Sequence, residues 1–148
     1  MKCLLCNDWI ESLPKLRDLI MFNQRKEYSC RSCKHQFKNL SKERCQNCNK
    51  ELYGDACIDC KLWIKKGYIP KHLAIYRYEE NMKEYFSRYK FMGDYCLRKI
   101  FQQDIKNNLK PFLKKGYTIV PVPLSEERLA ERGFNQVEGL IEGIPYQD

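Results

Sequence analysis

Four pairs of cysteines, each pair separated by two residues, are the groups in this sequence with the most specific chemistry. They are Cys3 and Cys6 in CLLC, Cys30 and Cys33 in CRSC, Cys45 and Cys48 in CQNC, and Cys57 and Cys60 in CIDC. Two intervening residues let both sulfurs of a tight turn reach one ion at about 2.3 Å, and two such turns complete a tetrahedral site. Four pairs therefore predict two zinc sites, each with four cysteine ligands.

Four thiolates around each ion leave no open position for a substrate, so the predicted zinc is structural. A redox dithiol is one alternative, but it needs a single reactive pair at a helix N-terminus, not four pairs in a polar segment. A disulfide framework is another, and it is disfavoured because the N-terminal MKCLLCNDW lacks the apolar core of a secretory signal. His35 also lies near a pair and offers an imidazole in place of one thiolate.

The way in which the pairs combine is open. In a sequential arrangement, the first two pairs bind one ion and the last two bind the other. In a cross-braced arrangement, alternating pairs share an ion. The sequential solution is favoured because the ligands of each site then lie closer along the chain.

The cysteines also divide the chain, since eight of the nine fall in the first sixty of its 148 residues. We expect a double zinc ribbon, with facing hairpins, over residues 1–66 and a second domain over residues 67–148. The ninth cysteine, Cys96 in GDYCLRKIF, takes an apolar position of an expected helix and is predicted to be buried.

The second part reads as strand, helix, helix, strand, which predicts the α/β class. LAIYRY (73–78) and TIVPVP (118–123) are the expected strands. Apolar residues at helical spacing mark the two helices, the first of which ends at Gly93. These residues are Met82, Tyr85, Phe86 and Tyr89 in the first helix, and Leu97, Ile100, Phe101 and Ile105 in the second, which continues through Leu109 and Phe112.

The loop after the second strand, PLSEERLAERGFNQ, has a composition that suits an anion. Arg128 and Arg132 share a face if the segment is helical, and Gly133 allows a ligand to approach the backbone closely. Asn135 and Gln136 supply neutral donors. An ordinary surface helix with its charged residues in salt bridges explains the same residues equally well.

CLLC, the further CxxC pairs, YKFMGD and IVPVPLSEERLAERGFNQ, in this order and spacing, resemble the ComF family, whose Gram-positive members belong to the DNA-uptake machinery of competence. The resemblance covers essentially the whole chain. It implies a zinc ribbon followed by a type I phosphoribosyltransferase domain, an enzyme that uses phosphoribosyl pyrophosphate (PRPP) with Mg²⁺. The loop after Val120 and Pro121 then corresponds to the pyrophosphate loop, with Arg132, Asn135 and Gln136 on its motif positions.

The sequence departs from the family pattern after this loop. The family domain continues to a DDxxTTGxT string, whose acidic residues bind the ribose diol and whose turn cradles the 5′-phosphate of PRPP. No such string follows VEGLIEGIPYQD. We therefore expect a C-terminally truncated, incomplete α/β domain with no catalytic residue of its own, inactive unless the missing half is supplied. Binding of PRPP and Mg²⁺ depends on the same missing half. Without the strands of that half as neighbours, the apolar TIVPVP segment is expected to be exposed.

Charge gives a weaker indication of partners. The formal net charge of +8 falls to about +4 if eight thiolates hold two zinc ions. A solvated lysine-rich surface explains this balance better than a nucleic-acid site does. The alternative function is a zinc-ribbon module that binds single-stranded DNA weakly, through residues such as Lys38, Lys42 and Lys61, or binds a competence helicase.

No apolar run approaches the roughly 20 residues that span a bilayer, so we expect a soluble, cytoplasmic protein.

Overall fold

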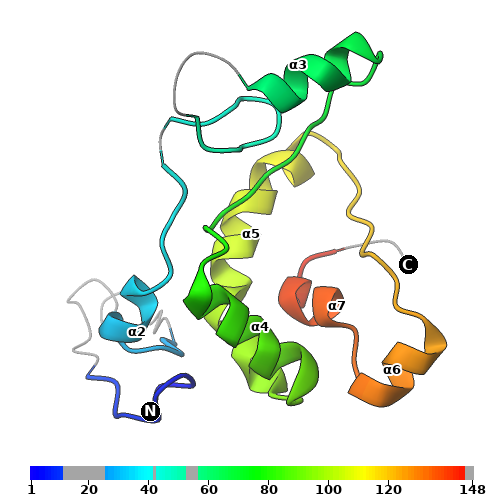
Figure 1. The fold of residues 1–148 in the computed structure, drawn as a ribbon. Coiled ribbons are helices and arrows are strands. Elements are labelled where there is room, and N and C mark those ends of the chain that lie inside the picture. Colours follow the sequence, from blue (N-terminus) through cyan, green and yellow to red (C-terminus); the bar gives the residue numbers. More distant parts are fainter. Residues whose placement is uncertain (12–25, 42, 53–56, 146–148) are drawn as a thin grey trace.

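The computed structural model describes residues 1–11, 26–41, 43–52 and 57–145, and most of its regular structure is helical (Figure 1). The elements are α2 (Arg31–His35), α3 (Ile58–Lys65), α4 (Glu80–Phe91), the 3₁₀ helix η1 (Tyr95–Arg98), α5 (Lys99–Lys114), α6 (Glu126–Arg132) and α7 (Gln136–Ile141). Within those ranges none of the helices combines the length and apolar character needed to cross a membrane.

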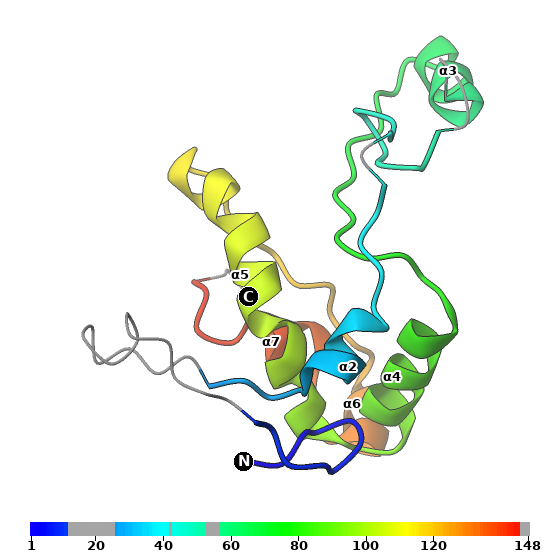
Figure 2. The ribbon, with the colours of Figure 1, turned by 90° about the vertical axis from the view of Figure 1, so that its left-hand side faces the viewer.

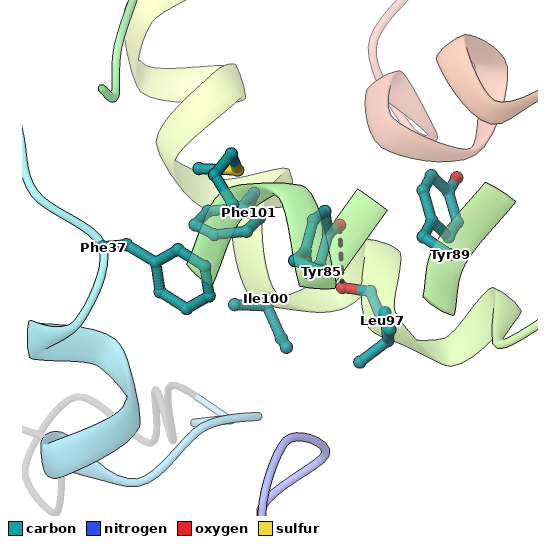
Figure 3. Packing of buried hydrophobic residues seen from close by; sticks show 7 residues of the cluster. Phe37, Tyr85, Tyr89, Leu97, Ile100 and Phe101 are labelled. Atoms are coloured by element: carbon teal, nitrogen blue, oxygen red, sulfur yellow. Dashed lines mark hydrogen bonds between the residues drawn. The ribbon is translucent and has the colours of Figure 1, made fainter. Parts of the chain in front are cut away.

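The core lies where α4, η1 and α5 meet, and the helical stripes predicted from the sequence form it. Its buried members are Phe37, Met82, Tyr85, Tyr89, Leu97, Ile100 and Phe101. Aromatic rings dominate this cluster: Tyr85 and Phe101 meet edge to face with their centroids 4.8 Å apart. Figure 3 shows Phe37, which comes from the cysteine-rich part, pointing into the same cluster.

The turn between α4 and α5 corrects one prediction, because Cys96 is exposed and its neighbour Leu97 is fully buried. The intervening residues form a 3₁₀ helix, in which three residues make a turn. This changes the phase of the apolar face relative to an α-helix. The hydroxyl of Tyr85 donates to the carbonyl oxygen of Leu97 (3.3 Å), which holds Leu97 inward. Gly93 ends α4 as predicted, with a φ of 69° in the left-handed region.

The two expected strands do not form among the described residues. In 73–78, Tyr76 makes one isolated antiparallel bridge, to Asn39. Residues 118–123 are extended without a ladder partner, and Val120 and Val122 are 68% and 71% exposed. A strand takes its hydrogen bonds from a neighbouring strand, and no neighbour lies beside this segment in the part of the chain that is described. The helical part of the α/β prediction is thus observed, and the sheet is not.

The two cysteine-rich segments lie at different distances from the core (Figures 1 and 2). Around α2, partly buried Leu4, Leu5 and Tyr28 pack against the helical core, in addition to Phe37. The segment that includes α3 projects away from α6 and α7, and a long extended stretch returns from it to α4. The division between residues 66 and 67 stays a prediction, and the packing of Leu4, Leu5, Tyr28 and Phe37 on the core crosses it.

Candidate metal centres and the arginine loop

The eight paired cysteines form two groups of four. Cys3, Cys6, Cys30 and Cys33 make the first group, and Cys45, Cys48, Cys57 and Cys60 make the second. Within each group the sulfur atoms all lie within 4.8 Å of one another. The pairs therefore combine in sequential order. Neither group contains a histidine, and His35 is exposed in the last turn of α2.

The sulfur separations suit a tetrahedral metal ion. Four sulfurs at 2.3 Å from a central zinc lie about 3.8 Å from one another. The Sγ atoms of Cys6 and Cys30 are 3.8 Å apart. In the second group, Cys45 and Cys60 are separated by 3.6 Å, and so are Cys48 and Cys57. Both groups thus have the ligand type and the spacing of a structural zinc site.

The first pair of each group sits in the same hairpin, repeated 42 residues further along the chain. The amide of Cys3 donates to the carbonyl of Asp8 (2.8 Å), and that of Asn7 donates to the carbonyl of Cys3 (3.0 Å). Cys45, Lys50 and Asn49 repeat both bonds at 2.9 Å. Asn7 and Asn49 have φ values of 64° and 58°, a left-handed conformation that asparagine tolerates. The Asn after each first pair is a sequence signal that the spacing argument missed.

The second pair of each group begins a helix. Cys30 is the N-cap residue of α2 and Cys57 is the N-cap residue of α3. Each group therefore combines one hairpin with one helix start, where a ribbon of two facing hairpins predicts a second hairpin. The free N–H groups and the dipole of a helix N-terminus favour negatively charged sulfur.

Local hydrogen bonds favour ionisation of a thiol in each group. The hydroxyl of Ser32 lies 3.1 Å from the sulfur of Cys30 and lowers the pKa of that thiol to about 6. Backbone N–H groups of the CQNC turn lower the pKa of Cys45 to about 7. Burial acts in the opposite direction on Cys33 and Cys60 and raises the pKa of both thiols. A bound cation favours the thiolate form of all four ligands.

The arginine loop is built from α6 and α7. Ser125 caps α6, and Gly133 ends it in the left-handed conformation, with a φ of 76°. Arg128 and Arg132 lie four residues apart on α6, as predicted, but their surroundings differ. Arg128 is exposed, whereas the guanidinium of Arg132 turns back to the Gln136 side chain (Nη1 to Oε1, 2.9 Å).

The two amides of the loop are buried and are used within the protein. The Oδ1 atom of Asn135 accepts from the amide of Val137 (2.9 Å) and caps α7, while its Nδ2 donates to Glu138 (2.6 Å). The side-chain oxygen of Gln136 accepts from Arg132, and its Nε2 atom donates to the carbonyl oxygen of Phe134 (3.5 Å). The amide donors that the sequence assigned to a ligand therefore bond within the protein.

Some capacity for an anion remains at Arg132. Its Nε atom is buried and has no hydrogen-bond partner among the described residues. Its guanidinium also lies over the ring of Phe91, 5.4 Å from the centroid. The alternative of an ordinary surface helix is met in one respect, because α6 has no buried residue, but the salt bridges expected of it are not observed: no ion pair involves α6 in the part of the chain described.

Comparison with known proteins identifies the family. The chain is 42% identical over 150 residues to the competence protein ComFC of Streptococcus pneumoniae and 34% identical over 146 residues to ComFC of Bacillus subtilis. These alignments cover 100% and 95% of the chain, which spans 67% and 60% of the lengths of the two relatives. No family model and no solved structure matches it. Identity at this level over the whole chain places it in the ComF family.

Proposed function

We propose that this chain is a competence-associated protein that binds two structural zinc ions and supplies the pyrophosphate loop of a phosphoribosyltransferase-like domain. The observation that carries the proposal is the grouping of all eight paired cysteines into two four-sulfur clusters of tetrahedral size. The two relatives, both competence proteins, support the biological setting. A cytoplasmic location, where thiols stay reduced, belongs to the same proposal.

Zinc serves to fold the cysteine-rich segments. Among the residues that the structure describes, the cluster around the second group consists of Cys45, Cys57 and Cys60, with Cys48 and Leu52 packed against it. Such a small apolar cluster cannot offset the entropy of ordering its loops. Zinc binding by four thiolates supplies roughly 10–16 kcal/mol of apparent free energy, which is large enough to offset the entropy of ordering these loops.

The arginine loop supports the second half of the proposal. Arg132 keeps an unpartnered buried donor, Arg128 is exposed, and Gly133 leaves the backbone between the two helices open, since nothing lies within 4 Å of a Cβ built on it. We propose that Arg132 exchanges Gln136 for a pyrophosphate oxygen when the ligand arrives. Charge-assisted bonds from a guanidinium suit this anion.

Phosphoribosyl transfer needs groups beyond this loop. The resemblance assigns the ribose and 5′-phosphate of PRPP, together with its Mg²⁺, to a DDxxTTGxT string that is not among residues 1–148. We therefore propose that these residues hold pyrophosphate weakly and do not transfer phosphoribosyl groups without that string.

The test of the zinc proposal is a native mass spectrum of the purified chain, combined with elemental analysis. Two zinc ions per chain are expected, and a chelator should remove both. A chain that is folded and metal-free would overturn this part of the proposal. Isothermal titration with pyrophosphate tests the loop, and no detectable binding at millimolar ligand contradicts it.

A second candidate function, contact with nucleic acid or with a competence-machinery protein such as a helicase, rests on α3. Leu62 and Trp63 on this helix are 55% and 50% exposed, beside exposed Lys61 and Lys65. Apolar and basic side chains together suit single-stranded DNA or an acidic protein surface. Of the other lysines considered, Lys38 pairs with Glu79 (3.0 Å), and residue 42 lies outside the described residues.

Fluorescence anisotropy with labelled single-stranded DNA tests this second function. Changing Lys61 and Lys65 together to glutamate should weaken binding and flatten its dependence on salt. Lys110 and Lys114, two exposed lysines of α5, provide a control pair of the same charge. Equal effects of the two double variants would contradict a specific role for α3.

A further inference from the structure

Arg88 of α4 connects the helical core to the first cysteine group. Its Nη1 atom donates to the carbonyl oxygen of Leu5 and its Nη2 atom to that of Leu4, each at 3.1 Å. Both carbonyls belong to the CLLC turn, between the ligands Cys3 and Cys6. The same Nη2 atom forms a 3.0 Å ion pair with Asp94. The position of α4 is thus tied to the shape of the metal-binding turn.

The next residue, Tyr89, connects the same helix to the arginine loop. Its hydroxyl donates to the carbonyl oxygen of Gln136 (2.9 Å), and the side chain is fully buried. Its ring packs against Phe134, with the centroids 5.3 Å apart. In Figure 3 the hydroxyl of Tyr89 points toward α7. The side chain of Gln136 also accepts from Arg132. The bond from Tyr89 therefore holds Gln136 in place, and Gln136 in turn orients the arginine.

A further connection runs from the second pair of the first group to α5. Lys34 follows the ligand Cys33, and its Nζ atom lies 2.5 Å from Oδ2 of Asp104. The hydroxyl of Tyr76 donates to the same carboxylate oxygen at 2.6 Å. With Phe37 buried in the core, both halves of the first group are held against the helices.

The second group has different connections. Its hairpin contacts the extended stretch before α4, through an ion pair of Glu51 with Arg77 (2.7 Å) and a bond from the amide of His72 to the carbonyl of Asn47 (2.9 Å). Its apolar cluster is separate from the core cluster. Figures 1 and 2 show α3 far from α6 and α7.

We propose that metal occupancy of the first cysteine group, and not of the second, controls the order of the arginine loop, and that Arg88 is the positioning residue that couples them. This inference rests on the proposed zinc binding. When the first group is empty, the CLLC turn is no longer held by its sulfurs, and Arg88 loses two fixed acceptors. The register of α4 then loosens, and the bond from Tyr89 to Gln136 loosens with it.

Matched ligand variants of the full chain test the coupling. Cys6→Ser and Cys48→Ser each remove the second ligand of a first pair, and neither residue is fully buried. Hydrogen exchange of residues 132–141 is the measurement, with zinc content determined in parallel. Each variant should retain one zinc ion. In Cys6→Ser, exchange in this segment should accelerate by about tenfold or more, whereas Cys48→Ser should stay within about twofold of wild type.

Arg88→Gln separates coupling from loss of metal, because it retains all eight ligands. It should bind two zinc ions and still show the accelerated exchange of residues 132–141. If Cys6→Ser fails to fold, Arg88→Gln tests the coupling without it. Equal exchange in the two cysteine variants, or unchanged exchange in Arg88→Gln with both ions bound, overturns the inference. A wild-type chain without zinc instead contradicts the proposed function.

Discussion

The backbone of Gly139 lies so close to Tyr89 that a Cβ atom on the glycine would sit 2.5 Å from the tyrosine hydroxyl oxygen. The same Cβ would lie 3.0 Å from the ring of Tyr95 and 3.3 Å from the side chain of Arg98. Gln102 also donates to the Gly139 carbonyl at 2.8 Å. Close approach at this one position brings α7 against the core helices, and the arginine loop with it.

Gly139→Ala should therefore destabilise the protein by about 1–3 kcal/mol, the usual cost of inserting a methyl group into a packed contact. Denaturant unfolding followed by tyrosine fluorescence measures this loss in the free energy of unfolding. The same substitution in a Tyr89→Phe background should cost less, since the hydroxyl that it meets is gone. Equal costs in the two backgrounds would contradict the contact.

Phe37→Ala should destabilise the helical part of the protein, although residue 37 lies in the cysteine-rich segment. Its buried ring packs 4.9 Å from that of Phe101, so its removal should cost about 3–5 kcal/mol. Trp63→Ala, on exposed α3, is the control and should change stability by less than about 0.5 kcal/mol. Thermal unfolding monitored by circular dichroism at 222 nm distinguishes the two variants. Similar losses of stability in both would be inconsistent with the packing of Phe37 in the helical core.

The ion pair of Arg98 with Glu142 (3.2 Å) should make stability depend on pH. Hydrogen bonds from Arg98 and Gln102 lower the pKa of Glu142 below that of the unfolded chain. The stabilisation is therefore fully present above the unfolded pKa and is lost as the pH falls through the lower folded pKa. Glu142→Gln should lower the melting temperature at pH 7 and converge with wild type in acid. A difference that is constant with pH would argue against the pair.

Arg132→Gln should weaken pyrophosphate binding at least about fivefold, because it removes the charge that the proposed site needs. Lys110→Gln, an exposed site on α5, removes the same charge outside the loop and should leave binding within about twofold. Isothermal titration at low salt measures both. Equal losses would mean that overall charge, not the loop, attracts the anion.

The sequence predicted several local features correctly. Two-residue spacing identified the eight grouped cysteines, and helical spacing identified Met82, Tyr85 and Tyr89 as core residues. Each of these depends on geometry within one turn or one helix. The break at Gly93 follows in the same way, since its left-handed φ suits glycine.

Other features depended on contacts between distant segments, and local pattern could not decide them. The strand prediction for 118–123 was wrong for the described structure, because a strand needs a partner that no local property supplies. Cys96 is exposed because a 3₁₀ turn, fitted between two packed helices, shifts the buried position to Leu97.

Spacing along the chain is enough to identify the residues that can bind metal and the helical faces that are apolar. Closeness along the chain favoured the sequential pairing of the cysteines, but the folded arrangement decided it, and that Arg132 turns toward Gln136 followed from the folded arrangement alone. The same is true of Arg88, which holds the first metal-binding turn. These contacts join residues far apart in sequence, and the free energy that selects them comes from packing and hydrogen bonding across the folded core.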